Sequence, residues 1–138
     1  DVVLVHAEAR DMARLLGQRE VHPVLLASLA PASLTAAYAA MKLLSQRCGL
    51  MSFDLLVGVA GGPRRGRPVV ERLASTADAF LGGVLRASAV IDRAEPLTTR
   101  GAPDLARLAA GQLMPTTLSL DAAPRLPRAG AHRPSLSY

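Results

Sequence analysis

Four apolar runs, separated by stretches with helical spacing, account for most of this chain. The first, VVLVHA at 2–7, is continuous and rich in β-branched residues, which is typical of a strand buried on both faces. Similar runs are found at 21–29, 53–60 and 84–91. Apolar positions recur at helical spacing in the intervening stretches at 8–17, 31–49, 68–82 and 102–113. Strands alternating with helices predict an α/β fold: a parallel sheet of about four strands with helices on both faces.

Glycine and serine positions predict where the longer helices begin and end. Ser33 is expected to cap the helix that follows Pro31, and Gly49 to end it. Gly82 is expected to end the next long helix, which has Pro68 in its first turn.

The periodic pattern ends near residue 114, which divides the chain into two parts. Residues 1–114 are expected to form one α/β domain. Residues 115–138 are Pro-, Ser-, Arg- and Ala-containing without periodicity, and we expect a mobile tail. The sequence starts at Asp1, inside an apolar run, and is therefore expected to be a fragment of a longer protein.

Composition and charge limit the classes of molecule that this chain is expected to bind. The net charge of the 138 residues is +5 and comes almost wholly from arginine, since Lys42 is the only lysine. Such a charge permits an anionic partner, but the arginines are scattered and aromatics make up only 3%, which argues against nucleic-acid binding. Cys48 is alone, so no intramolecular disulfide forms and a reducing, cytoplasmic compartment fits. No apolar run approaches the ~18 residues that span a bilayer.

The loop GVAGGPRRGRPVV at 58–70 is the first candidate site, because ligands of parallel sheets bind beyond the carboxyl ends of the strands. A phosphate loop of the G-x-x-x-x-G-K-[ST] type needs a lysine and a hydroxyl after its second glycine. Here Gly61 and Gly66 have the spacing, but Arg67 and Pro68 follow. A flexible connection and an anion contact through the arginines both stay open.

No other residue set completes a catalytic or metal site. His6, at the end of the first predicted strand, is either a candidate base or a core or loop histidine, and no nucleophile accompanies it. His22 and His132 share no ligand spacing with it, so we predict no zinc site. Cys48 lies near a helix C-terminus, where the pKa of a thiol is not lowered, and is not expected to act as a nucleophile.

The order of segments resembles the second half of the MinD/ParA-type ATPases, most closely their flagellar-number regulators. The likeness rests on DVVLVHAEA, VLLASLAPASLTAAYAAMKLLSQ, FDLLVGVAGG and RPVVERLASTADAFLGGVLRASAVI, which together span residues 1–113. Its most specific part is the set Pro31, Ser33, Thr35, Ala37, Tyr38 and Lys42.

The resemblance implies a deviant-Walker P-loop fold that uses ATP and magnesium, forms a homodimer and associates peripherally with the inner membrane. The implied partners are a flagellar signal-recognition-type GTPase or flagellar assembly proteins. The base side of the nucleotide site would correspond to Gly58, Ala60, Asp92 and Arg93. His6 would stand at the magnesium side, and Pro31, Ser33 and Thr35 would belong to a switch-like segment.

Departures from the family pattern remove most of its polar chemistry. The P-loop with its signature lysine precedes this half in the family and is not in this sequence. His6 replaces an acidic residue, Gly58 replaces the asparagine that reads adenine, and Ala36 and Ala94 each replace an aspartate. We therefore expect no ATP hydrolysis by this chain, and nucleotide binding that is lost or residual.

Three functions follow from these observations. The first is a degenerate MinD-like regulator of flagellar number or placement that acts by binding partners. The second is another MinD/ParA-type protein, from cellulose synthesis or from plasmid or chromosome partition. The third is an α/β interaction module without chemistry. The segment 102–113 is short for an interfacial helix, so membrane association through it is expected to be weak.

Overall fold

The computed structural model of this chain describes residues 3–17, 21–95 and 102–114. Along the chain, its elements are α1 (Ala9–Leu16), β1 (Val24–Ser28), α2 (Pro31–Cys48), β2 (Ser52–Val59), the 3-10 turn η1 (Pro63–Gly66), α3 (Arg67–Leu81), β3 (Val84–Asp92) and α4 (Pro103–Leu113). The tail predicted at 115–138 lies outside the described residues.

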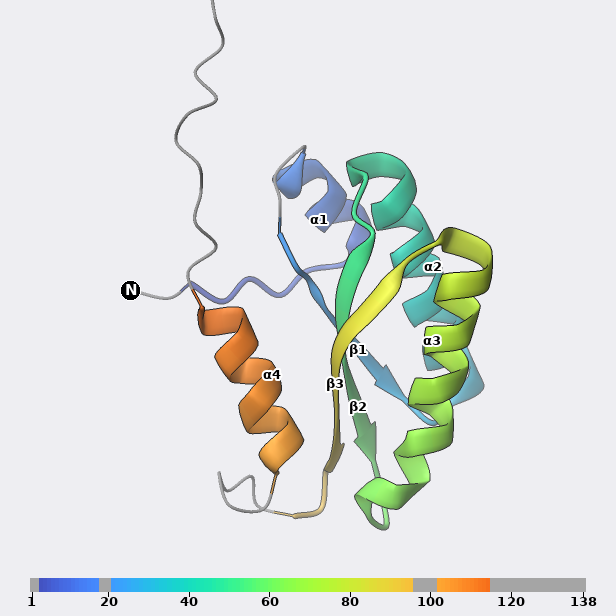
Figure 1. The fold of residues 1–138 in the computed structure, drawn as a ribbon, viewed down its shortest axis with the longest axis vertical. Coiled ribbons are helices and arrows are strands. Elements are labelled where there is room, and N and C mark those ends of the chain that lie inside the picture. The colour runs from blue at the N-terminus through green and yellow to red at the C-terminus, as the bar shows by residue number, and fades with distance from the viewer. Residues whose placement is uncertain (1–2, 18–20, 96–101, 115–138) are drawn as a thin grey trace, which may run out of the picture.

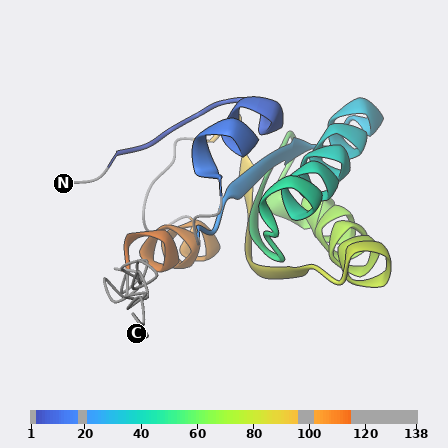
Figure 2. The ribbon, with the colours of Figure 1, turned by 90° about the horizontal axis from the view of Figure 1, so that it is seen from above.

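The three strands form one sheet in the order β1-β2-β3, and both pairings are parallel. Helices α2 and α3 make the two crossovers, as the alternating pattern predicts. Figure 2 shows α2 and α3 on one face of the sheet and α4 on the other, so the prediction of helices on both faces is confirmed. The arrangement is an α/β fold of the Rossmann or P-loop kind.

The prediction of about four strands is wrong, because residues 3–7, the described part of the first apolar run, form no strand. Residues 3–8 belong to no helix or strand, and the side chains of Val3 and Leu4 are 84% and 92% exposed. An apolar run forms a buried strand only where a neighbouring strand can pair with it and other elements can cover its faces, since strand preference depends on tertiary context. The segment has neither among the described residues (Figure 1).

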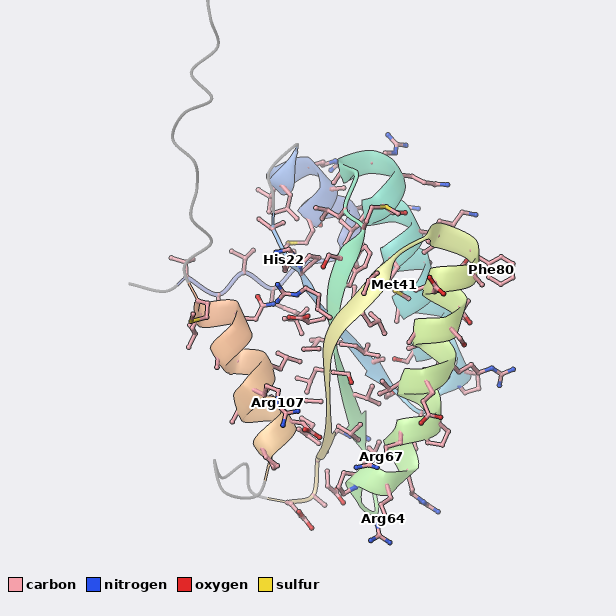
Figure 3. The ribbon with its side chains drawn as sticks, viewed as in Figure 1. His22, Met41, Arg64, Arg67, Phe80 and Arg107 are labelled. Carbon is pink, nitrogen blue, oxygen red and sulfur yellow. The ribbon has the colours of Figure 1, made fainter. Side chains whose placement is uncertain are left out.

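The core lies between the sheet and the layer of α2 and α3. Side chains alternate along β2, and Phe53, Leu55, Val57 and Val59 point into this layer with at most 1% exposure. Met41 of α2 and Ala77 of α3 are fully buried against them (Met41 is labelled in Figure 3). Burying each large aliphatic or aromatic side chain contributes about 1.5–3 kcal/mol, so β2 anchors the fold.

The predicted helix ends are right and one predicted cap is wrong. Gly49 and Gly82 follow the last residues of α2 and α3, as expected. Ser33 does not cap α2, because Ala30 is the residue before the helix and Pro31 is its first residue. Proline favours that first position because its missing N–H has no intrahelical partner there.

Helix α1 packs on α2 rather than directly on the sheet. The thiol of Cys48, the last residue of α2, lies 3.7 Å from the carbonyl oxygen of Ala13 in α1. Cys48 is buried, which fits a packing role for the residue.

Candidate functional site

The carboxyl edge of the sheet gathers the residues predicted for the base side of a nucleotide site. Gly58 pairs with Ser28 of β1 and with Ile91 of β3, and Ala60 follows the end of β2. Asp92 is the last residue of β3, and the amide of Arg93 donates to the carbonyl of Val59 at 2.9 Å. The structure therefore brings Gly58, Ala60, Asp92 and Arg93 to one place.

The Asp92 carboxylate organises this edge through three main-chain amides. One oxygen accepts from Gly61 at 3.1 Å and from Gly62 at 2.7 Å, and the other accepts from Ala94 at 3.0 Å. The bonds from Ala94 and Gly62, then that from Gly61 and the nearby Arg93 charge, hold the pKa of this carboxyl below its ordinary value. Asp92 is therefore an anion bound within the chain's own loop.

The loop after β2 takes the form of a small amide nest. Gly61 and Gly62 have φ angles of 84° and 96°, a region that glycine enters without the steric cost of a Cβ. Consecutive amides turned inward in this way bind anions. Because Asp92 already occupies both amides, this loop is not a free phosphate cradle.

Arg93 covers the base-side position. A Cβ added to Gly58 would lie 3.2 Å from Cδ and 3.4 Å from Cγ of Arg93, so the aliphatic part of that side chain lies directly over the glycine. The position that the resemblance predicted for the base side is thus a bare backbone covered by the aliphatic part of an arginine side chain.

The switch-like segment begins α2 beside this edge, with its hydroxyl groups engaged. Ser33 Oγ accepts a hydrogen bond from the amide of Ser28, the last residue of β1, at 3.0 Å. Thr35 Oγ1 donates to the carbonyl of Pro31 at 3.1 Å. Pro31, Ser33 and Thr35 therefore fix the turn from β1 into α2.

His6 is not where the sequence predicted it. It is exposed, in a segment without helix or strand, and does not end a buried strand. Figure 1 shows this segment level with the C-terminal end of α4, away from the strand arrowheads at the carboxyl edge. The prediction of a magnesium-side position for His6 depended on that strand. Because the strand is not formed, the prediction has no geometric basis.

A second polar centre, built around Asp54, was not predicted from the sequence. Asp54 is 0% exposed near the start of the largely apolar strand β2, and among the described residues it is the only buried charged group. Its carboxylate accepts from Arg86 Nε at 3.3 Å and Nη2 at 3.2 Å, from the amide of Ala87 at 3.1 Å, and from Gln112 Nε2 at 2.6 Å. The one available signal was an aspartate inside the run FDLLV.

A bulge in β3 makes this centre possible. Phe53 pairs with Leu85 but Asp54 pairs with Ala87, which leaves Arg86 as the extra residue. Bulges redirect side chains, and here the guanidinium reaches the carboxylate on the neighbouring strand. Gln112 of α4 donates also to the carbonyl of His22 at 3.0 Å, so the centre ties α4 to the sheet. The Nδ1 atom of His22 is buried nearby without a hydrogen-bond partner (Figure 3). The role of this centre is therefore structural, because it stabilises the packing of α4 against the sheet.

A cleft of ≈ 530 Å³ lies beside β3, between the N-terminal ends of α3 and α4. Its charged lining consists of Arg64, Arg67, Glu71 and Asp104, and Asp104 is paired with Arg107 at 3.2 Å. Figure 3 shows Arg64 and Arg67 at the end of the molecule where η1 turns into α3. The expectation of an anionic partner for these arginines stays a prediction.

No protein-family model matches the sequence, and no curated protein matches it. Among the described residues, no helix is both long and apolar enough to cross a membrane.

Proposed function

We propose that this chain is a partner-binding regulator of the MinD/ParA type in which the nucleotide site has become a structural contact. The observation that carries the proposal is the Asp92 carboxylate on the amides of Gly61 and Gly62, at 3.1 and 2.7 Å. A phosphate at this loop would have to displace a bound anion, and Asp92 would then repel it. The aliphatic part of the Arg93 side chain lies over Gly58 and likewise blocks the position predicted for the base.

The process served is the control of flagellar number or placement, with a flagellar signal-recognition-type GTPase or a flagellar assembly protein as partner. Support for this comes from the order of segments between residues 1 and 113 and from the set Pro31 to Lys42. Within such a regulator the described residues supply a rigid frame, and binding rather than hydrolysis carries the function.

Calorimetric titration with ATP and with ADP, each with magnesium, tests the nucleotide part. The expected result is no binding heat up to about 1 mM ligand, a concentration that would detect interactions worth about 4 kcal/mol. Saturable binding in the micromolar range would contradict the proposal, provided that Arg93→Glu weakens it and so places it at this edge.

The partition alternative makes a separate prediction, because proteins of that kind bind DNA without sequence preference. The exposed arginines of η1 would be the contact, and binding would fall steeply with salt. Retention of the chain on a nonspecific duplex at low salt, lost in the Arg64→Glu/Arg65→Glu double variant, would favour partition over flagellar control.

A further inference from the structure

The outer edge of β3 has no ladder partner within the described residues. The strand order β1-β2-β3 places β3 at the edge, and its pairing is with β2 alone. Native edges are usually protected by charge, proline or a bulge. Residues 87–91, ASAVI, have no charge and no proline, and the bulge at Arg86 lies before them. Figure 1 shows β3 in front of the other strands, with α4 on one side and α3 on the other.

The main chain of Ser88 and Val90 faces this open edge. In a parallel strand the N–H and C=O of one residue point to the same side, and the side alternates along the chain. The amide of Arg93 donates to Val59 of β2 at 2.9 Å, so Ile91 and Ala89 face β2 and the residues between them face outward. Ser88 and Val90 also line the ≈ 530 Å³ cleft, which therefore runs beside the free hydrogen-bonding groups.

A strand placed in this cleft would be covered on both of its faces. Val70 of α3 lines one wall, and Leu105 of α4 lines the other. An alternating apolar and polar strand would bury polar groups against one of these helices. The cleft therefore fits a continuous apolar run, which is the pattern of strands covered on both faces.

Within the part of the chain that the structure describes, one such run has no strand partner. Val3, Leu4 and Val5 are 84%, 92% and 53% exposed, in a segment that belongs to no helix or strand. Exposed aliphatic residues in sequence indicate an interaction surface.

We propose that residues 3–7 of one copy add as a strand to the β3 edge of a second copy. Reciprocal exchange closes a two-fold dimer, in which each copy both donates a strand and accepts one. Because the contact is with the side edge of β3 and uses neither the amides of Gly61 and Gly62 nor the position covered by Arg93, the association is independent of nucleotide and goes beyond the proposed function. The outer edge of β1 is the weaker acceptor, because it is five residues long and Pro23 before it has no N–H.

Sedimentation velocity of the full chain between about 10 and 200 µM, which brackets a micromolar dissociation constant, tests the proposal. The wild-type chain is expected to be dimeric at the upper end of this range. Leu4→Glu should make it monomeric by charging the added strand, and Ser88→Pro by removing an outward amide while leaving the ladder to β2 intact. A wild-type chain that stays monomeric throughout would overturn the proposal.

Control variants exclude general effects of adding a charge to an exposed leucine or of replacing Ser88. Leu15→Glu charges another exposed leucine, at 63% exposure in α1, and Ser88→Ala keeps the amide, so both should dimerise like the wild type. Leu26→Pro alters the β1 edge and should leave the dimer intact; its loss there with Ser88→Pro unaffected would assign the contact to β1 and overturn the proposal.

Cross-linking provides a readout that does not depend on how well the proline variant folds. An equimolar mixture of a Leu4→Cys chain and a Ser88→Cys chain should form a mixed disulfide on oxidation, since adjacent strands bring Cβ atoms within bonding range. Cross-linking no faster than in a mixture of Leu15→Cys and Ser88→Cys chains would count against strand addition.

Discussion

Two aspartates with different surroundings organise the described part of this chain. Asp92 is partly exposed and accepts three main-chain amides, whereas Asp54 is fully buried and accepts from two side chains and one amide. The first fixes a loop and the second fixes a helix. Removing these two sets of contacts should therefore have different effects on the free energy of unfolding and on its dependence on pH.

Asp92→Asn should remove a part of the stability that depends on pH. The bonds from Ala94, Gly62 and Gly61 lower the pKa of Asp92 in the folded state relative to the unfolded chain. Their contribution is fully present above the unfolded value, about 3.9, and is lost as pH falls through the lower folded value. Urea unfolding should show a wild-type advantage at pH 6 that disappears toward pH 2. Asp78→Asn, at an exposed site on α3, is the control and should show no such trend.

Arg86→Ala should destabilise more than Asp54→Ala. The first variant leaves a carboxylate that is 0% exposed without its counter-charge, which costs about 3–5 kcal/mol. The second leaves a guanidinium whose side chain is 35% exposed and can reach water, so about 2–3 kcal/mol is expected. Equilibrium unfolding in urea measures both, and the reverse order would show that the buried carboxylate is satisfied without Arg86.

Gly66→Ala tests the contact between η1 and β3. A Cβ at Gly66 would lie 2.4 Å from Cγ1 and 3.0 Å from Cγ2 of Val90, which forces one of the two segments to move. Overpacking of this kind costs about 1–3 kcal/mol. Adding Val90→Ala should recover part of the loss in a double-mutant cycle. Strictly additive effects of the two changes would mean that the clash is relieved elsewhere.

At the scale of elements, α4 depends on a few polar contacts at its C-terminal end. Gln112 bonds both Asp54 and the carbonyl of His22, at 2.6 and 3.0 Å, and Leu108 is the buried apolar residue of the helix. A helix held this way should open more readily than α2, which buries four residues.

Gln112→Ala should therefore loosen α4 while α2 and α3 stay protected. Hydrogen exchange followed by mass spectrometry should show faster exchange over 103–113 and unchanged exchange over 31–48. Gln46→Ala, on the exposed face of α2, is the matched control. Uniformly faster exchange over all helices would show that the Asp54 centre supports the whole domain rather than one helix.

The elements were predictable where local pattern and tertiary context agree. Runs 53–60 and 84–91 became β2 and β3, and the two long helices end where Gly49 and Gly82 predicted. Residues 2–7 have an equally strong strand pattern, but pairing depends on partners that a local pattern does not contain. The Asp54 centre was missed because it needs a bulge at Arg86 and a glutamine 58 positions away. The grouping of Gly58, Asp92 and Arg93 was predictable, since carboxyl ends of parallel strands meet at one edge.

At the scale of the whole molecule, the sheet presents two edges of different character. The carboxyl edge is closed by the chain's own groups, with Asp92 on the glycine amides and Arg93 over Gly58. The side edge along β3 has no ladder partner among the described residues, and Ser88 and Val90 line the cleft beside it. These two edges are the basis of both proposals, which are protein binding through the side edge and no nucleotide binding at the carboxyl edge.

Two-dimensional amide NMR of the ¹⁵N-labelled chain tests the closure of the carboxyl edge most directly. With magnesium and ATP at about 1 mM and neutral pH, the amide signals of Gly61, Gly62 and Arg93 should not move, whereas lowering the pH through the titration of Asp92 should shift Gly61, Gly62 and Ala94 together. In Asp92→Asn that acid-induced shift should be absent. Shifts of Gly61 and Gly62 that saturate with ATP at neutral pH in the wild-type chain would contradict the account.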